Sequence, residues 1–172
     1  MSKRALKKYI AGLDREALAE QLIDLYDRFS EVKTYYDFVF NPKEEELLHE
    51  AKARIKREYT PRGKRRPKAR RSVAQKFIRH YKTLGVDPQL LADLMAFNLE
   101  TALRYEQGRN CSDAFYRSML NSCREWAAFL VHHGLWGTFE TRFSAFVAAV
   151  ESAAWPNRSA FEALEEQCEH TP

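Results

Sequence analysis

The sequence predicts an all-α protein: antiparallel helical hairpins that form a bundle or a short α-solenoid. Apolar side chains recur every three or four residues along most of the chain, which is the spacing of one helix face. Asn, Asp, Ser, Pro and Gly residues interrupt this pattern where helices would begin and end. No segment alternates apolar and polar residues as a half-buried strand does. Short turns between long helices favour antiparallel neighbours.

The N-terminal region, residues 1–60, is predicted to hold three helices. Ser2 caps a short first helix, and Asp14 caps a long amphipathic helix. The apolar stripe of that long helix consists of Leu18, Leu22, Leu25, Phe29, Val32, Tyr36 and Val39. Asn41 and Pro42 end it and begin the next helix, with Asn as the cap and Pro at the first helical position.

Residues 61–71 are predicted to be a basic, mobile linker. Gly63 and Pro67 oppose regular structure, and the cations of this stretch repel one another. Residues 72–172 are predicted to form a C-terminal helical bundle. The N-terminal region, the linker and this bundle are either separate parts of the chain or one continuous domain. Turn and cap residues divide this bundle at Gly85, Asp87-Pro88, Gly108, Ser112-Asp113, Gly134, Thr138 and Trp155-Pro156.

Charge is distributed unevenly along the chain. Residues 1–85 hold 22 Lys and Arg against 12 Asp and Glu, whereas residues 86–172 hold 6 against 12. The first part is therefore strongly basic and the second acidic. This asymmetry indicates a polyanionic partner, an electrostatic contact between the two parts, or both.

The basic linker and the helix after it are the predicted nucleic-acid interface. Extended, the linker spans roughly 30 Å at about 3.3 Å per residue, enough to follow several phosphates of DNA or RNA. Such contacts give affinity without sequence information. A solvated loop and docking onto the acidic C-terminal part are the alternatives. The predicted binding residues are Arg62, Lys64, Arg65, Arg66, Lys68, Arg70, Arg71, Lys76, Arg79 and Lys82.

The aromatic run Tyr35, Tyr36, Phe38 and Phe40 has two interpretations. Exposed rings would stack on unpaired bases. On a helix, however, Tyr36 and Phe40 fall near the apolar stripe, and such stripes are usually buried. Packing in a core or an interface is therefore the preferred interpretation.

The sequence gives no sign of a catalytic or metal site, and no cofactor is expected. No glycine-rich phosphate loop or nucleophile elbow occurs. His132 and His133 are adjacent and point about 100° apart on a helix, so they suit a helix end better than one metal ion. Di-metal bundles require Glu-x-x-His motifs from two helices, whereas this sequence has that spacing once, at Glu46 and His49. We expect that the protein is not an enzyme.

The cysteines and the N-terminus predict a cytoplasmic protein without a membrane role. Cys111, Cys123 and Cys168 are odd in number and form no closely spaced pair, so buried free thiols are expected. The charged N-terminus lacks the apolar stretch of a signal peptide, and no apolar run approaches the roughly 20 residues of a membrane span.

Several stretches of the first hundred residues resemble a small bacterial family known only as a domain of unknown function. The stretches are SKRALKKYI at 2–10, LYDRF at 25–29, VKTYYDFVFNP at 32–42, RRSVAQKFIRHY at 70–81, LGVDP at 84–88 and LADLMAFN at 91–98. The resemblance implies a bacterial cytoplasmic helical protein and brings no activity or functional residue.

The sequence therefore leads to two functional hypotheses. The first is a helical binding protein that contacts nucleic acid through its basic stretch. The alternative is a protein–protein interaction module or a homo-oligomeric scaffold, which would bind a protein partner or a second copy and have no nucleic-acid role.

Overall fold

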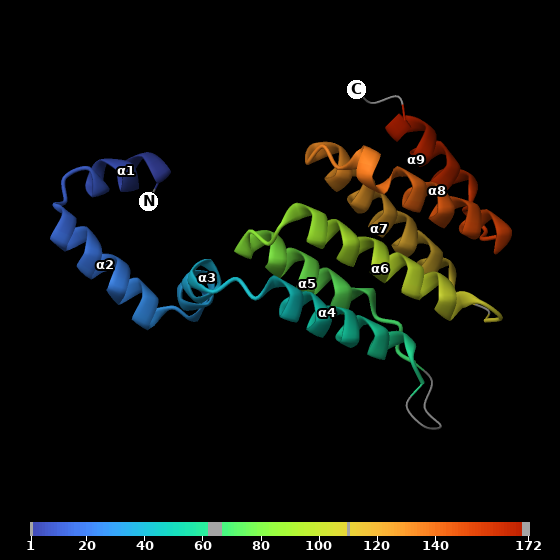
Figure 1. The fold of residues 1–172 in the computed structure, drawn as a ribbon, viewed down its shortest axis with the longest axis horizontal. Coiled ribbons are helices and arrows are strands. Elements are labelled where there is room, and N and C mark those ends of the chain that lie inside the picture. Colours follow the sequence, from blue (N-terminus) through green and yellow to red (C-terminus); the bar gives the residue numbers. More distant parts are fainter. Residues whose placement is uncertain (1, 62–66, 110, 170–172) are drawn as a thin grey trace. The chain divides into compact units, whose positions relative to one another are not determined.

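The protein is entirely helical in the computed structural model, which describes residues 2–61, 67–109 and 111–169 (Figure 1). Within these residues the chain forms nine α-helices and no strand, which confirms the predicted fold class. The chain divides into two compact units, an N-terminal unit (Met1–Lys43) and a C-terminal bundle (Glu44–Pro172). The third predicted helix, α4 (Glu44–Tyr59), packs against α5 and α6 and so belongs to the bundle.

The N-terminal unit consists of α1 (Lys3–Ile10), α2 (Arg15–Arg28) and α3 (Ser30–Phe40). Both predicted caps at its start are confirmed. The Ser2 hydroxyl accepts a hydrogen bond from the amide of Ala5 at 3.3 Å, and the Asp14 carboxylate accepts one from the amide of Ala17 at 2.8 Å. These bonds satisfy amides that have no partner within their helices.

The single long helix expected after Asp14 is wrong in one respect, because it breaks at Phe29. Phe29 is extended, with φ −119° and ψ 113°, and Ser30 begins a new helix. The turn allows α3 to pack against α2 and lets the Tyr26 hydroxyl donate a 2.8 Å hydrogen bond to Asp37. In a straight helix these residues would lie about 16 Å apart along the axis. The tertiary contact therefore outweighs the continuous helical pattern.

The C-terminal bundle continues from α4 through five more helices. They are α5 (Arg71–Leu84), α6 (Pro88–Glu106), α7 (Asp113–His132), α8 (Trp136–Ser152) and α9 (Ser159–Glu169). Most boundaries agree with the predicted turn and cap residues. Gly85 ends α5 in the left-handed conformation, with φ +81°. α4 begins at Glu44 rather than at Pro42, since the backbone of Asn41 is still ending α3.

Helices α4 and α6 lie parallel to each other, and α5 runs back beside both (Figure 1). At the start of the pair, the Glu44 carboxylate accepts a hydrogen bond from the amide of Asp87 at 2.9 Å. At the end of the pair, the rings of Tyr59 and Tyr105 lie 5.6 Å apart. The C-terminal ends of α4 and α6 therefore meet at the same end of the bundle.

The core of the bundle is centred on α6, which contacts α4, α5, α7 and α8. Every helix of the bundle contributes a large, fully buried side chain to this core. Examples are Ile55, Tyr81, Leu94, Trp126, Phe143 and Phe161, in the order of the helices. Burial of these side chains is the main stabilising contribution to the fold. No helix in the described ranges combines the length and apolar character that a bilayer crossing requires.

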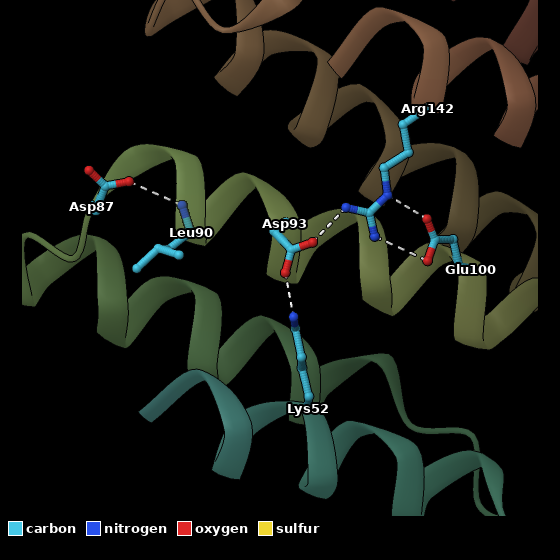
Figure 2. Close-up of polar contacts among 6 residues, drawn as sticks. All are labelled: Lys52, Asp87, Leu90, Asp93, Glu100 and Arg142. Carbon is cyan, nitrogen blue, oxygen red and sulfur yellow. Dashed lines mark hydrogen bonds and ion pairs between the residues drawn. The ribbon is translucent and has the colours of Figure 1, made fainter. Parts of the chain in front are cut away.

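A ladder of ion pairs joins α4, α6 and α8 beside this core (Figure 2). Arg142 donates to both carboxylate oxygens of Glu100, at 2.6 and 3.1 Å, and to Asp93 at 2.6 Å. Asp93 also pairs with Lys52. Burial raises the pKa of Asp93, but the hydrogen bonds from Lys52 and Arg142 outweigh burial and lower it overall. The two cations and two carboxylates of the ladder balance each other.

Candidate functional site

The predicted nucleic-acid interface is only partly within the described residues. Arg62, Lys64, Arg65 and Arg66 lie outside them. The other six predicted residues fall into two groups. Two of them form ion pairs with carboxylates of the protein, and four do not.

Arg70 is paired with Glu58, near the end of α4. Its Nε and Nη2 atoms donate to the two carboxylate oxygens of Glu58, at 2.8 and 2.9 Å. These hydrogen bonds lower the pKa of Glu58. The amide of Ala69 also donates to the backbone oxygen of Glu58 at 2.8 Å. A fork-to-fork pair of this kind fixes geometry as well as charge, so Arg70 anchors the start of α5 to α4.

Arg71 is paired with α7. Its Nη2 donates to Glu125 at 2.8 Å, and its Nε donates to the Ser122 hydroxyl at 2.7 Å. The Arg71 side chain is 27% exposed. This contact agrees with the alternative given for the basic stretch, in which it docks onto the acidic C-terminal part instead of binding phosphates.

The remaining four predicted residues are exposed. Lys68 and Lys76 form no ion pair with another described residue. Arg79 donates to the backbone oxygen of Gln75 in its own helix. The Lys82 ammonium lies 4.9 Å from the ring centroid of Phe129. These four cations, rather than Arg70 and Arg71, are the described part of the predicted interface that could meet a phosphate.

The N-terminal unit presents an apolar surface of a kind that the bundle lacks. All eleven strongly exposed large apolar side chains of the described residues precede Glu44, and no side chain of α1, α2 or α3 is buried. Phe40 is the extreme case, at 80% exposure. The exposed set is Leu6, Tyr9, Ile10, Leu18, Leu22, Ile23, Leu25, Phe29, Tyr35, Val39 and Phe40.

The charges of the N-terminal unit are separated between its first two helices. α1 carries only cations, and α2 carries mainly carboxylates. A hydrogen bond between the side chains of Gln21 and Tyr9 joins these helices. Within the described part of the chain, however, none of the following side chains takes part in an ion pair: Lys3, Arg4, Lys7, Lys8, Glu16, Glu20 and Asp27.

The predicted aromatic run forms no closed core. Tyr36 stacks on Phe40 with ring centroids 5.9 Å apart, and Tyr35 meets Tyr36 edge-on at 5.4 Å. Tyr35 and Phe40 are exposed, whereas Tyr36 and Phe38 are half-buried. The rings therefore pack on one another at the surface.

The described residues contain no group of three or more His, Cys, Asp or Glu side chains placed to hold a metal ion. His132 ends α7 and His133 occupies the cap position. Their rings are nearly perpendicular, at 88°. Cys123 and Cys168 are buried free thiols, and burial raises the pKa of both, whereas Cys111 is half-buried.

Comparison with known proteins identifies the family of the chain but assigns no activity to it. The model of a family described only as of unknown function, DUF6155, matches residues 1–169. The match extends well past the first hundred residues, to which the sequence resemblance is confined. Neither a curated protein nor a solved structure matches the chain.

Proposed function

The chain belongs to DUF6155, a family of unknown function, and we propose that its role is assembly, in which two copies pair through the N-terminal unit. The exposure of eleven large apolar side chains in this unit is the observation that supports the proposal. Folded proteins rarely expose apolar surface of this density unless it is an interaction site.

The size of the N-terminal unit supports the same proposal. Its three helices bury no side chain of their own, although they contain regular apolar stripes. At 43 residues the unit lies near the limit of about 40 residues, below which a domain usually needs a metal, disulfides or a partner because its surface is too large for its volume. A second copy would bury the stripes that one copy leaves in water.

The separated charges favour a second copy over an unrelated partner. The four cations of α1 and the unpaired carboxylates of α2 are complementary, yet they do not meet within one copy. A two-fold interface is self-complementary, since each contact occurs twice with the roles of the copies exchanged. In such an interface α1 of one copy would lie against α2 of the other, where the unpaired charges would compensate each other.

Sedimentation of the full chain tests the proposal. The wild type is expected to sediment as a dimer, and the combined change Leu22→Glu and Leu25→Glu is expected to shift it to monomer, because carboxylates would enter the apolar interface. Ala128→Glu is the matched control, since it adds a carboxylate at an exposed position of α7.

Two results would decide against pairing of copies. A wild-type chain that sediments as a monomer at every concentration contradicts it. The second result is a monomer that co-purifies with a different protein and loses that protein when Leu22→Glu and Leu25→Glu are introduced. The apolar surface would then be a docking site for that protein and not for a second copy.

Nucleic-acid binding is the second candidate function. It is supported by the exposure of four predicted residues, Lys68, Lys76, Arg79 and Lys82, none of which is paired with a carboxylate among the described residues. Since Arg70 and Arg71 already bind Glu58 and Glu125, this candidate rests on fewer cations than the sequence suggested.

A further inference from the structure

A cavity of about 410 Å³ opens where α4 and α6 end together. This volume lies within the range of roughly 300–1,000 Å³ that small-molecule sites occupy. The cavity is formed by residues far apart in the sequence, from the last turns of α4, from α6 and from the turn that follows α6. Its lining consists of Lys56, Tyr59, Thr60, Phe97, Thr101, Arg104, Tyr105 and Arg109.

The charge of this cavity is unbalanced. Its lining holds three cations, Lys56, Arg104 and Arg109, and no carboxylate. In the ion-pair ladder, by contrast, the cations are matched: Lys52 of α4 and Arg142 of α8 face Asp93 and Glu100 of α6 (Figure 2). A groove between α4 and α5 likewise contains glutamates beside its arginines. The cavity at the end of the α4–α6 pair thus has a surplus of three positive charges, whereas the α4–α5 groove and the pocket beside Lys82 have a surplus of one each.

Both guanidinium groups of the cavity are held by the protein while most of their donors stay unused. The guanidinium of Arg109 lies 4.7 Å from the ring centroid of Tyr105 and donates to the Tyr105 backbone oxygen. Arg104 donates to the Thr101 hydroxyl at 3.3 Å. A guanidinium group has five N–H donors in a planar fork that matches phosphate oxygens. Each group therefore has donors left for a ligand.

A buried hydroxyl at the same place is without a partner. Tyr59 is 6% exposed, and its hydroxyl makes no hydrogen bond with the described residues. Burial raises the pKa of Tyr59 to about 12, so the group remains a neutral donor at ordinary pH. A buried donor without an acceptor is destabilising. The hydroxyl oxygen has almost no accessible surface, however, so it lies behind the cavity wall and is not one of the groups that would contact a ligand.

Helix stability accounts for part of this arrangement. Cations near a C-terminal end favour the negative end of the helix dipole, and Lys56 and Arg104 lie in the last turns of α4 and α6. Arg109 follows the end of α6 and donates to a carbonyl of its last turn, so the same effect applies to it. Helix stability accounts for each cation separately, but not for the three lying together around one cavity without a carboxylate.

We propose that this cavity binds a terminal phosphate ester, with its oxygens between Arg104, Arg109 and Lys56 and its organic part against Phe97. A phosphate monoester carries nearly two negative charges near neutral pH, which suits a cavity with three cations. Such a group occurs in a free mononucleotide and at the phosphorylated end of a nucleic-acid strand. The site uses no residue of the N-terminal unit and is independent of the proposed assembly.

Titration calorimetry of the full chain tests the site with four probes: adenosine monophosphate, adenosine, and one oligonucleotide with and without a terminal phosphate. The monophosphate and the phosphorylated strand are expected to bind better than their counterparts without phosphate. Equal or tighter binding of the monophosphate would identify a free nucleotide as the ligand class. Tighter binding of the phosphorylated strand would identify a strand end.

Three variants assign the binding to this cavity. Arg104→Gln with Arg109→Gln is expected to weaken phosphate binding roughly tenfold or more, since each removes a charge-assisted hydrogen bond. Tyr59→Phe is expected to bind phosphate like the wild type, because the hydroxyl that it deletes has almost no accessible surface and does not meet a ligand in the cavity. Arg117→Gln, an exposed cation of α7, is the matched control and should bind like the wild type.

Three results would overturn the proposal. One is that neither phosphorylated probe binds. Another is that the strands with and without terminal phosphate bind equally while the monophosphate does not, which would place binding on the basic surface instead. The third is that the variant with Arg104→Gln and Arg109→Gln binds as tightly as the wild type.

Discussion

Arg71 and Glu125 are 54 positions apart in the sequence and 2.8 Å apart between Nη2 and Oε1. The sequence around Arg71 predicts that it contacts phosphates. In the fold it instead joins the first turn of α5 to α7, together with the bond to Ser122. A basic residue in a basic stretch can thus be structural, and its partner decides which role it has.

The Arg71–Glu125 pair should make a modest contribution to stability. Arg71→Gln and Glu125→Gln are each expected to lower the free energy of unfolding, and their coupling in a double-mutant cycle should be roughly 0.5–1 kcal/mol because both groups are partly exposed. Urea unfolding of the four proteins measures it. A coupling of zero would mean that the pair contributes nothing measurable to stability.

Nucleic-acid binding by the exposed cations predicts a specific salt dependence. Replacing Lys68, Lys76, Arg79 and Lys82 together by Gln should reduce the slope of log K against log salt by roughly 0.9 for each duplex phosphate that the variant no longer neutralises. Arg70→Gln and Arg71→Gln should leave the slope unchanged, since their guanidinium groups are paired internally. Fluorescence anisotropy with duplex DNA at several salt concentrations measures the slopes. An unchanged slope in the fourfold variant would reject this interface.

The ion-pair ladder predicts a loss of stability in acid. The pKa of Asp93 is lower in the folded chain than in the unfolded chain, so the folded state binds fewer protons. Its stabilising contribution is fully present above the unfolded value of about 3.9 and is lost as the pH falls through the folded value. Arg142→Gln should cost roughly 1.5–3 kcal/mol near neutral pH and make the acid loss smaller. Urea unfolding across a pH series, with Arg117→Gln as control, measures both effects.

Charge reversal tests whether α1 and α2 of different copies meet. Lys3→Glu with Arg4→Glu, and separately Glu20→Lys with Asp27→Lys, should each weaken the dimer, because like charges would face each other. Mixing the two variants should restore pairing, since every contact then joins opposite charges. Sedimentation of the separate and mixed proteins measures this. Restored dimers when all four changes are in one chain, but not on mixing, would place the contact within a copy.

The cap of α6 predicts a local stability effect. The Asp87 carboxylate accepts a hydrogen bond from the amide of Gln89 at 2.8 Å. It also accepts one from the amide of Leu90 at 3.2 Å (Figure 2). Asp87→Ala should lower the free energy of unfolding by roughly 0.5–2 kcal/mol, and Asp87→Asn by less, because the amide oxygen still accepts. Thermal unfolding of the three proteins compares them. Equal losses in both variants would show that charge, rather than the cap bonds, matters.

The sequence predicts the helices of the bundle well because local chemistry determines them. Asp87-Pro88 begins α6 and Gly85 ends α5, as their backbone preferences require. The apolar positions of α6 and α7, such as Leu94 and Trp126, are buried as their spacing indicates. These features depend on residues within one or two helical turns of each other.

The break at Phe29 is not predictable in the same way. No Gly or Pro marks it, and the apolar stripe runs through it without a change of period. The turn is stabilised by contacts between α2 and α3, including the bond from Tyr26 to Asp37. A local pattern cannot reveal a contact that forms only after the chain turns.

The candidate site is even less accessible to sequence reasoning. The apolar stripe of α2 has the spacing of a core face, yet Leu22 and Leu25 are both 42% exposed. The spacing of a stripe shows which side chains share a face but does not show what covers that face. Likewise, Lys56 and Arg104 share a cavity because α4 and α6 are parallel, and that pairing is a property of the tertiary fold.

The absence of buried side chains in α1, α2 and α3 also bears on how the chain can change over generations. Substitutions in this segment open no void in a packed interior, so they are tolerated on grounds of folding. The binding partner of the N-terminal unit can therefore change during evolution while the bundle of α4 to α9 keeps its thermodynamic stability.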